Sequence, residues 1–396
     1  MSAAADPANR AWFPGLVIHT VIAHATYNGV RVLISYRTLE LGGSGVVLGL
    51  MTAVYSLVPL LTALFVGRLV DRGYATAVLW VGTALSILPV ALAATAPNLG
   101  VLLFATMSLG FGQLLTTVAS QALIPQSFPA SKLTAKFGHL TLGVSIGQTI
   151  GLPLAGMVAD ATSGDTAITN ALWFMTALSA LTLIAAVIVM LRGRTPHVSR
   201  AEAAEGAIAP MALLSVRGMK PAIFASMATL AAVDLMTAYL PLIGQQNGLT
   251  VTTVTWLLAA RTFASVISRL FIGFLTRKWR NLSLLWTASA AAGLCVVLIP
   301  VLSQPWTLAI LLTIAGFCFG LTQPLTMTWV STLSDPANRA AVLSIRLAGN
   351  RLSQVAIPSA ASALTVIAGS GIVFTISGAL LLLAGGVTWR NQHEKW

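Results

Sequence analysis

Long apolar segments recur along almost the whole chain. Twelve such runs fall between short polar breaks, near residues 12–36, 44–66, 76–96, 99–124, 137–159, 169–191, 219–243, 249–275, 281–302, 305–332, 341–366 and 370–389. A hydrocarbon core about 30 Å thick requires roughly 20 apolar residues in each spanning helix. The runs therefore predict an all-α polytopic membrane protein with twelve transmembrane helices.

The charge content supports a lipid environment for most of the surface. Only 8% of the 396 residues are charged and 57% are hydrophobic, whereas a soluble domain carries about 25% charged residues. The formal net charge of +12 would suggest nucleic acid in a soluble protein, but the basic residues lie mostly in short segments between apolar runs. We therefore expect a lipid bilayer as partner, and no nucleic acid.

The basic residues also predict the orientation of the chain in the membrane. On the twelve-span map, sixteen of the 22 Lys and Arg residues lie on one face, and the opposite loops carry Arg37 alone, beside Glu40. Cytoplasmic loops carry an excess of Lys and Arg. The first apolar run is full length and follows no signal-peptide core, so we read it as a retained span. This pattern predicts a multi-pass protein of the cell (inner or plasma) membrane with both termini in the cytoplasm.

The chain divides into two similar halves. The longest polar stretch, residues 192–218, is expected to be a cytoplasmic linker between six-helix bundles at residues 1–191 and 219–396. Gly42 and Gly248, Gly110 and Gly316, and the segments that begin at Gly67 and Gly273 all share an offset of 206 residues. Internal repeats are a recurring sign of alternating-access transporters, with the solute site near the midplane between the repeats.

One loop carries a resemblance to a known family. The segment Gly67-Arg68-Leu69-Val70-Asp71-Arg72-Gly73, with the twelve runs and the central linker, resembles the signature loop of the major facilitator superfamily. The resemblance implies two pseudo-symmetric six-helix bundles that work by alternating access. It also implies that Gly67 permits a tight exit from the second span and that Asp71 and Arg72 form a cytoplasmic latch.

The 137–159 run contains a row of glycines. Gly143, Gly147, Gly151 and Pro153 are similar to the glycine-proline motif of proton-coupled exporters in that superfamily, although Leu152 separates the last two residues of the motif here. Glycines four residues apart also make a smooth ridge on which another helix can pack. Both interpretations, close helix packing and exporter polarity, stay open.

Charged residues inside the membrane mark the candidate site. An ionisable group at the bilayer centre costs at least about 2.5 to 3.5 kcal/mol, so such groups are expected to be functional or paired. Arg261 lies deep in the 249–275 run, and Asp234, in the middle of the 219–243 run, is the only deep carboxylate. Asp234 is either a static partner of Arg261 or a carrier of the coupling proton.

Two further runs carry polar faces. In the 341–366 run, Arg346, Asn350 and Gln354 recur at four-residue spacing and share one face, with Arg351 nearby. Arg346 either contacts solute or extends to the cytoplasm, whereas Arg351 lies deeper. The 12–36 run carries a second polar face with Asn28 at the repeat position of Asp234, formed by His24, Tyr27, Asn28 and Arg31. His24 is either a proton-coupling residue or a hydrogen-bonded packing residue.

These groups predict the class of solute. Arg31, Arg261, Arg346 and Arg351 outnumber the single deep carboxylate, and bidentate arginines suit carboxylates. We expect a secondary transporter for a small organic anion, a carboxylate, that is coupled to protons or to anion exchange. A proton-coupled multidrug exporter is the alternative. The sequence contains no nucleophile elbow, P-loop or cluster of metal ligands, so no enzyme, cofactor or metal is expected.

Overall fold

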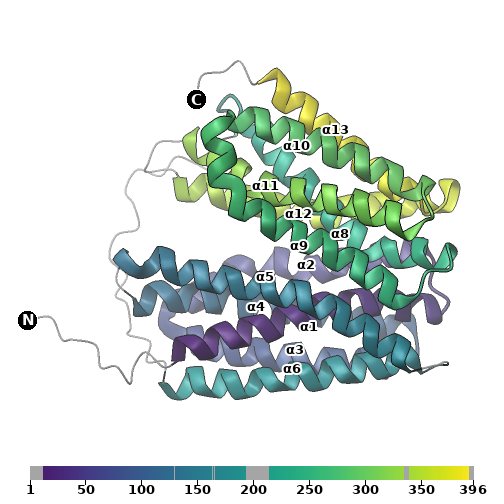
Figure 1. The fold of residues 1–396 in the computed structure, drawn as a ribbon. Helices are drawn as coiled ribbons and strands as arrows, with labels where there is room; N and C mark the ends of the chain where they lie inside the picture. Colours follow the sequence, from purple (N-terminus) through teal and green to yellow (C-terminus); the bar gives the residue numbers. More distant parts are fainter. Residues whose placement is uncertain are drawn as a thin grey trace, which may run out of the picture. The chain divides into compact units, whose positions relative to one another are not determined.

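The computed structural model describes residues 12–128, 130–162, 164, 166–192, 214–333 and 339–391, and Figure 1 shows its ribbon. Long helices dominate these residues: α1 (Trp12–Glu40), α2 (Gly45–Leu69), α3 (Ala75–Ala94), α4 (Leu99–Ser127), α5 (Ala130–Ala161), α6 (Ala167–Arg192), α8 (Met219–Gln246), α9 (Val251–Lys278), α10 (Asn281–Leu298), α11 (Pro305–Thr332), α12 (Arg339–Ala368) and α13 (Ile372–Arg390). A π-helical turn at Val70–Tyr74 precedes α3, and a 3₁₀ turn at Ile299–Val301 follows α10. The expected all-helical architecture is confirmed.

Ten of these helices are long and apolar enough to cross a membrane; α1 and α12 are not among the ten. Both helices have the length, with 29 and 30 residues. Their hydropathy is lower because they carry the two polar faces of the candidate site, which include His24 and Asn28 on α1 and Arg346 and Asn350 on α12. Polar residues within a span are expected where a helix faces protein or a water-filled cavity rather than lipid.

The described helices form two compact units. Unit 1 comprises Met1–Gly42 and Val54–Arg200, and unit 2 comprises Gly43–Ala53 and Ala201–Trp396. The first turns of α2 therefore group with unit 2, where the Tyr239 hydroxyl donates to the carbonyl oxygen of Gly45 at 2.5 Å. Most of the expected linker, residues 193–213, lies outside the described residues.

Each unit has the same internal packing order. In unit 1, α1 packs on α5 and α6, and α3 packs on α4 and α6. In unit 2, α8 packs on α12 and α13, and α10 packs on α11 and α13. If the six helices of each unit are numbered along the chain, the first packs on the fifth and sixth, and the third packs on the fourth and sixth, in both units.

The repeat extends to single residues. The helices α2 and α9, α3 and α10, and α4 and α11 begin 206 residues apart. Gly42 and Gly248, which follow the ends of α1 and α8, have φ values of +76° and +69°. A glycine in this left-handed region commonly ends a helix because it has no Cβ to clash. The same offset that links the glycines in the sequence therefore links two equivalent helix ends.

Close helix crossings are also repeated. A Cβ atom on Gly110 of α4 would clash with the carbonyl oxygen of Tyr55 on α2. A Cβ atom on Gly316 of α11 would clash with the carbonyl oxygen of Arg261 on α9. Tyr55 and Arg261 are themselves 206 residues apart, so both glycines permit the same crossing in their respective units.

The glycine row of α5 lies against α1. Added Cβ atoms would clash with the carbonyl oxygens of Val21 at Gly147 and of Ala25 at Gly151, and a Cβ at Gly143 would touch Val17 at 3.4 Å. Pro153 lies within the same continuous helix. The backbones of α1 and α5 approach so closely because these positions carry no side chain.

Candidate functional site

A buried polar network occupies the interior of unit 2. It is built from α8, α9, α11 and α12, and its centre is the face of α12 that carries Arg346, Asn350 and Gln354, all of which are buried. Ser353 joins this face to α8 because its hydroxyl donates to the carbonyl oxygen of Met227 at 3.2 Å. The four-residue spacing in the sequence therefore correctly groups side chains that point into one helix bundle.

Arg346 is directed toward α11. Its Nη2 atom donates to the side-chain Oε1 of Gln323 at 2.5 Å and to the backbone oxygen of the same residue at 3.3 Å. Only 3% of the Arg346 surface is exposed. The guanidinium group is thus held within the bundle by neutral acceptors from a single residue. Gln323 is a member of the network that the sequence reasoning missed.

Gln354 connects a carboxylate with an arginine. Its amide Nε2 donates to Asp234 Oδ2 on α8 at 2.6 Å. Its Oε1 accepts from Arg351 Nη1 at 3.2 Å. Through this amide, the deep carboxylate and the half-buried arginine belong to one continuous chain of hydrogen bonds.

Arg261 reaches α8 on either side of Asp234. Its Nη1 donates to the carbonyl oxygen of Val233 at 3.0 Å, and its Nη2 lies 3.3 Å from the hydroxyl of Thr237. The residue is 6% exposed, so its charge is well removed from water. Arg261 therefore contacts α8 one residue before and three residues after Asp234.

Unit 1 contains a similar contact between its first two helices, but there the arginine lies on the first helix rather than on the second. The Arg31 guanidinium of α1 lies over the ring of Tyr55 on α2, with 4.7 Å between its carbon and the ring centroid. The Tyr55 hydroxyl donates to Gln113 Oε1 at 2.8 Å. Residues 31 and 55 correspond by the 206-residue offset to Thr237 and Arg261. Each unit therefore places one arginine between its first two helices, but from opposite partners.

The other residues predicted on α1 make mainly internal contacts. The Tyr27 hydroxyl lies 2.5 Å from Ser86 Oγ and 2.9 Å from Thr116 Oγ1, which joins α1 to α3 and α4. The Asn28 amide donates to the backbone oxygen of His24 at 3.0 Å. These bonds use the Tyr27 hydroxyl and an Asn28 donor to stabilise unit 1.

His24 and His19 line a small cavity in unit 1 together with Thr116, Ser120 and Gln121. The volume of about 20 Å³ is enough for one water molecule. Buried Nδ1 atoms of both histidines have no hydrogen-bond partner within the described part of the chain. The sequence offered a signal for the missed residues, since Thr116, Ser120 and Gln121 are polar positions within an otherwise apolar run.

The tautomer of neutral His19 follows from its neighbour. His19 Nε2 lies 2.9 Å from Thr83 Oγ1, and the Thr83 hydroxyl donates to the carbonyl oxygen of Leu79 at 2.7 Å. With its proton used in that bond, Thr83 accepts from His19 Nε2, so Nδ1 of the neutral ring is an acceptor. A water molecule in the cavity could donate to it.

The predicted latch lies at the end of α2. Gly67 has open space around it, and Arg72 is exposed. Gly73 has a φ of +93° within the π-helical turn, which directs the chain into α3. The side chain of Asp71 lies outside what the structure describes, so the latch stays a prediction.

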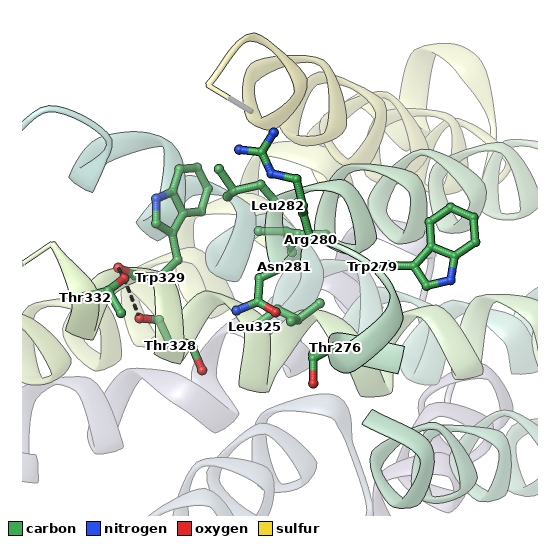
Figure 2. Close-up of a pocket in the computed structure, with 10 residues that line it drawn as sticks. Thr276, Trp279, Arg280, Asn281, Leu282, Leu325, Thr328, Trp329 and Thr332 are labelled. Atoms are coloured by element: carbon green, nitrogen blue, oxygen red, sulfur yellow. Dashed lines mark hydrogen bonds between the residues drawn. The ribbon is translucent and has the colours of Figure 1, made fainter. Parts of the chain in front are cut away.

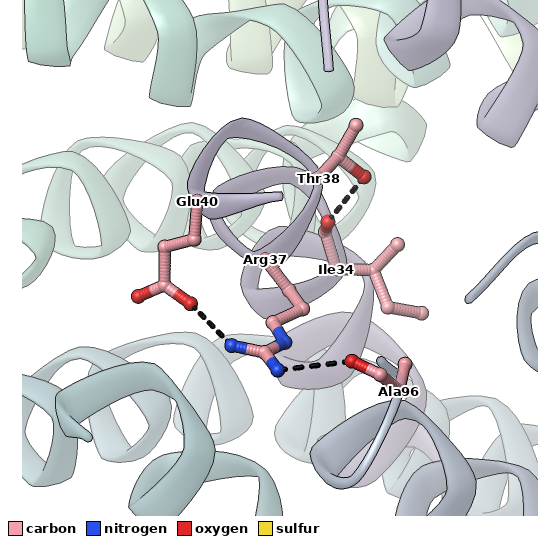
Figure 3. Close-up of polar contacts among 5 residues, drawn as sticks. All are labelled: Ile34, Arg37, Thr38, Glu40 and Ala96. Carbon is pink, nitrogen blue, oxygen red and sulfur yellow. Dashed lines mark hydrogen bonds and ion pairs between the residues drawn. The ribbon is translucent and has the colours of Figure 1, made fainter. Parts of the chain in front are cut away.

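Near the C-terminal end of α1, the half-buried Arg37 and the exposed Glu40 form an ion pair, with 3.0 Å between Nη1 and Oε2 (Figure 3). Arg37 Nη2 also donates to the carbonyl oxygen of Ala96 at 3.0 Å, in the connection between α3 and α4. Among the described residues, no group of three His, Cys, Asp or Glu side chains could hold a metal ion.

Comparisons with known proteins agree with the fold. The family model of the Major Facilitator Superfamily matches residues 16–247 and 222–396. No curated protein matches the chain by sequence.

Several solved structures share the architecture. A bacterial homologue of the human lysosomal transporter Spinster, in an inward-facing and unoccupied conformation, is 14% identical with a TM-score of 0.74, covering 99% of this chain and 100% of its own. The nucleoside transporter NupG is 13% identical with a TM-score of 0.76, covering 97% and 100%. A POT family transporter in complex with 5-aminolevulinic acid is 12% identical with a TM-score of 0.78, covering 96% and 95%.

Proposed function

This chain belongs to the major facilitator superfamily and is a multi-pass membrane transporter, and from this premise we propose that it moves a small organic anion by alternating access. The observation that carries the proposal is the network of unit 2, where Arg261, Arg346 and Arg351 are accompanied by a single carboxylate among the described residues, that of Asp234. The four side chains come from three helices; Gln354 connects Asp234 with Arg351, and Gln323 accepts from Arg346.

The charge balance of this network favours an anionic solute. Desolvated arginines are costly within a membrane unless negative charge compensates them. Asp234 supplies one negative charge for three guanidinium groups, which leaves an excess of positive charge within the network. A solute carboxylate would reduce that excess, and the planar guanidinium group binds carboxylates in a bidentate geometry. Arg351 is the least buried of the three, and we assign it first contact with the solute.

Proton coupling is assigned to Asp234. Gln354 donates a hydrogen bond to its carboxylate oxygen Oδ2 at 2.6 Å, and a proton on that oxygen would remove one acceptor from the chain that leads to Arg351. The proton and the solute are thereby linked through a single amide. His24, beside the small polar cavity of unit 1, is the second candidate for proton coupling.

A proton-coupled drug exporter is the alternative function. The glycine row of α5, the nearby Pro153 and the deep carboxylate of Asp234 favour it. Transport of a lipophilic cation would use Asp234 as the counter-charge, but the three arginines around it would repel such a solute. The two proposed functions therefore differ in the sign of the solute charge that this network would bind.

The first experiment is a thermal-shift screen of the purified protein against organic carboxylates and lipophilic cations. A ligand at one hundred times its dissociation constant stabilises a protein by about 2.7 kcal/mol. We expect stabilisation by a carboxylate, lost in Arg261→Ala and Arg351→Ala but kept in Arg390→Ala, which removes an arginine at the end of α13. Stabilisation by cations alone, lost in Asp234→Asn, would establish the drug-export alternative instead.

The role of Asp234 is tested by transport. Once a solute is known, Asp234→Asn in proteoliposomes should abolish accumulation driven by a pH gradient while solute counterflow continues, because exchange requires no net proton movement. Gln354→Leu, which removes the donor to the carboxylate, should shift the pH dependence without abolishing coupling. Wild-type accumulation in the folded Asp234→Asn variant would contradict the assignment.

A further inference from the structure

A cavity of about 410 Å³ lies in unit 2 where α9 ends, α10 begins and α11 runs past them. Its lining includes Trp279, Arg280, Asn281, Thr328, Trp329 and Thr332, with leucines between them, and Figure 2 shows these side chains around it. The cavity uses none of the residues of the polar network described above. Its volume is within the range of roughly 300 to 1,000 Å³ that is typical of small-molecule sites.

Arg280, the charged residue among those that line this cavity, is basic. Residues 251–332, which make up α9, α10 and α11 with their connections, contain five basic residues and no acidic residue. Three of the five, Arg277, Lys278 and Arg280, fall within four positions at the end of α9, and Arg280 lines the cavity. The nearest acidic residue later in the sequence is Asp335, which lies outside the described residues.

The start of α10 adds an electropositive element. Its N-cap residue, Arg280, makes no side-chain capping bond, and its first turn has no acidic residue. The first amide groups of a helix have no acceptor within the helix, and together with the helix dipole they favour an anion. Arg280 and Asn281 can supply further hydrogen-bond donors to the same ligand, whereas the hydroxyls of Thr328 and Thr332 donate to carbonyl oxygens of α11.

The internal repeat shows that the connection between α9 and α10 lacks a carboxylate that the connection between α2 and α3 has. Arg277 follows Asp71 by the 206-residue offset, so a basic residue occupies the position of an acidic one. The connection after α9 therefore brings positive charge where the connection after α2 brings mixed charge. An external anion would balance this excess.

The surroundings identify the kind of anion. Trp279 is 55% exposed and Trp329 is buried at the cavity, and tryptophans are enriched at membrane–water interfaces. In the proposed orientation this end of the helices is cytoplasmic, where the leaflet carries anionic lipids that basic pockets between helices can bind. We propose that the cavity binds the phosphate-bearing headgroup of an anionic phospholipid. The assignment rests on the proposed orientation but not on the proposed solute.

The test compares lipids that differ only in headgroup charge. Purified protein in a neutral detergent would receive phosphatidylglycerol or phosphatidylcholine with the same acyl chains, and bound lipids would be counted by native mass spectrometry beside the unfolding temperature. We expect retention of phosphatidylglycerol with a higher unfolding temperature. Arg280→Gln should weaken retention by about tenfold or more, as expected for the loss of a charge-assisted hydrogen bond.

The neighbouring basic residues provide matched controls. Arg277→Gln and Lys278→Gln make the same change of charge at the same helix end, but neither residue lines the cavity. Both variants should retain phosphatidylglycerol within about twofold of wild type, since exposed charges contribute little. Asn281→Leu, which removes an amide donor from the cavity wall, should weaken retention without any change of net charge.

Three outcomes would overturn the proposal. Equal losses in all three charge variants would show a diffuse attraction to a basic surface rather than a site. Equal retention of the two lipids would show that the cavity does not distinguish headgroups by their charge. Stabilisation by inorganic phosphate but not by phosphatidylglycerol, lost in Arg280→Gln, would show a site for a soluble anion. Arg261→Ala should leave lipid retention unchanged, so failure of the solute site would not be mistaken for failure of this one.

Discussion

Arg346 and Arg351 are five residues apart on α12, and their surroundings differ. Arg346 is held by both oxygens of Gln323, whereas Arg351 is half-buried and reaches Gln354. A guanidinium group fixed by buried acceptors is suited to holding helices together, and a less buried one can change partners when a solute arrives. This contrast leads us to assign solute contact to Arg351 before Arg346.

We predict that Gln323→Ala destabilises the protein by about 2 to 4 kcal/mol, because it removes an acceptor from a buried charge. The measurement is thermal or denaturant unfolding of purified protein in detergent. Gln113→Ala is the control, since it removes the acceptor of a neutral hydroxyl, that of Tyr55, and should cost about 1 kcal/mol. Equal effects of the two substitutions would show that Arg346 finds another acceptor.

Residue-level partners were only partly predictable. The spacing of Arg346, Asn350 and Gln354 correctly indicates a shared face, because helical periodicity is a local property. The choice of Gln323 as the acceptor for Arg346 could not be predicted, since it depends on how α11 and α12 are rotated toward each other. A neutral glutamine in an apolar run carries no charge that would mark it as a partner.

At the level of elements, the contact between α1 and α5 shows how glycine spacing sets the distance between helices. Gly147 and Gly151 lie on the carbonyl oxygens of α1, while Gly138 on the same helix has no atom within 4 Å of an added Cβ. The glycines of α5 thus occupy positions of two kinds. Only the packed positions require glycine.

We predict that Gly151→Ala and Gly138→Ala have opposite effects. The first should lower the stability by about 1 to 3 kcal/mol or more, since the added methyl group overpacks the helix crossing. The second should be neutral or stabilising by up to about 1 kcal/mol, because alanine favours a helix more than glycine does. The unfolding temperatures of the two variants in detergent test this, and a loss of stability at Gly138 equal to that at Gly151 would contradict it.

Element boundaries were well predicted by hydropathy. The run expected near 305–332 corresponds to α11 at Pro305–Thr332. The run expected near 281–302 corresponds to α10 and the 3₁₀ turn that follows it, which ends at Val301. The largest deviation is at the start of α5, which begins at Ala130 rather than near residue 137, and α1 likewise continues past its apolar run to Glu40. Helix ends can extend into the polar headgroup region, where hydropathy no longer marks them.

For the whole molecule, the distribution of basic residues predicts the orientation. Lys and Arg favour the cytoplasmic side during insertion, and the strong imbalance between the two sets of loops leaves little conflict between them. The connection between α5 and α6 should then face outward, and the linker inward.

We predict opposite labelling of two engineered cysteines in intact cells. With Cys295 and Cys318 replaced by serine, Thr166→Cys before α6 should react with a membrane-impermeant maleimide, and Ser199→Cys in the linker should react only after the cells are opened. Replacing the two native cysteines removes any background labelling. Both are buried. Labelling of Ser199→Cys in intact cells would reverse the proposed orientation.

The sequence by itself determined the helical class and the twofold repeat, because each depends on hydropathy and spacing along a single chain. Helix starts at equal offsets and the paired left-handed glycines, Gly42 and Gly248, agree with that reading. Tertiary structure alone decided which polar groups meet: Gln354 beside Asp234, Gln323 beside Arg346, and Arg280 at a cavity with Thr328 and Thr332. Hydrogen bonds and cavities between helices depend on the rotations and crossing distances of whole helices. A local sequence pattern does not determine these quantities, so it cannot predict which two residues meet.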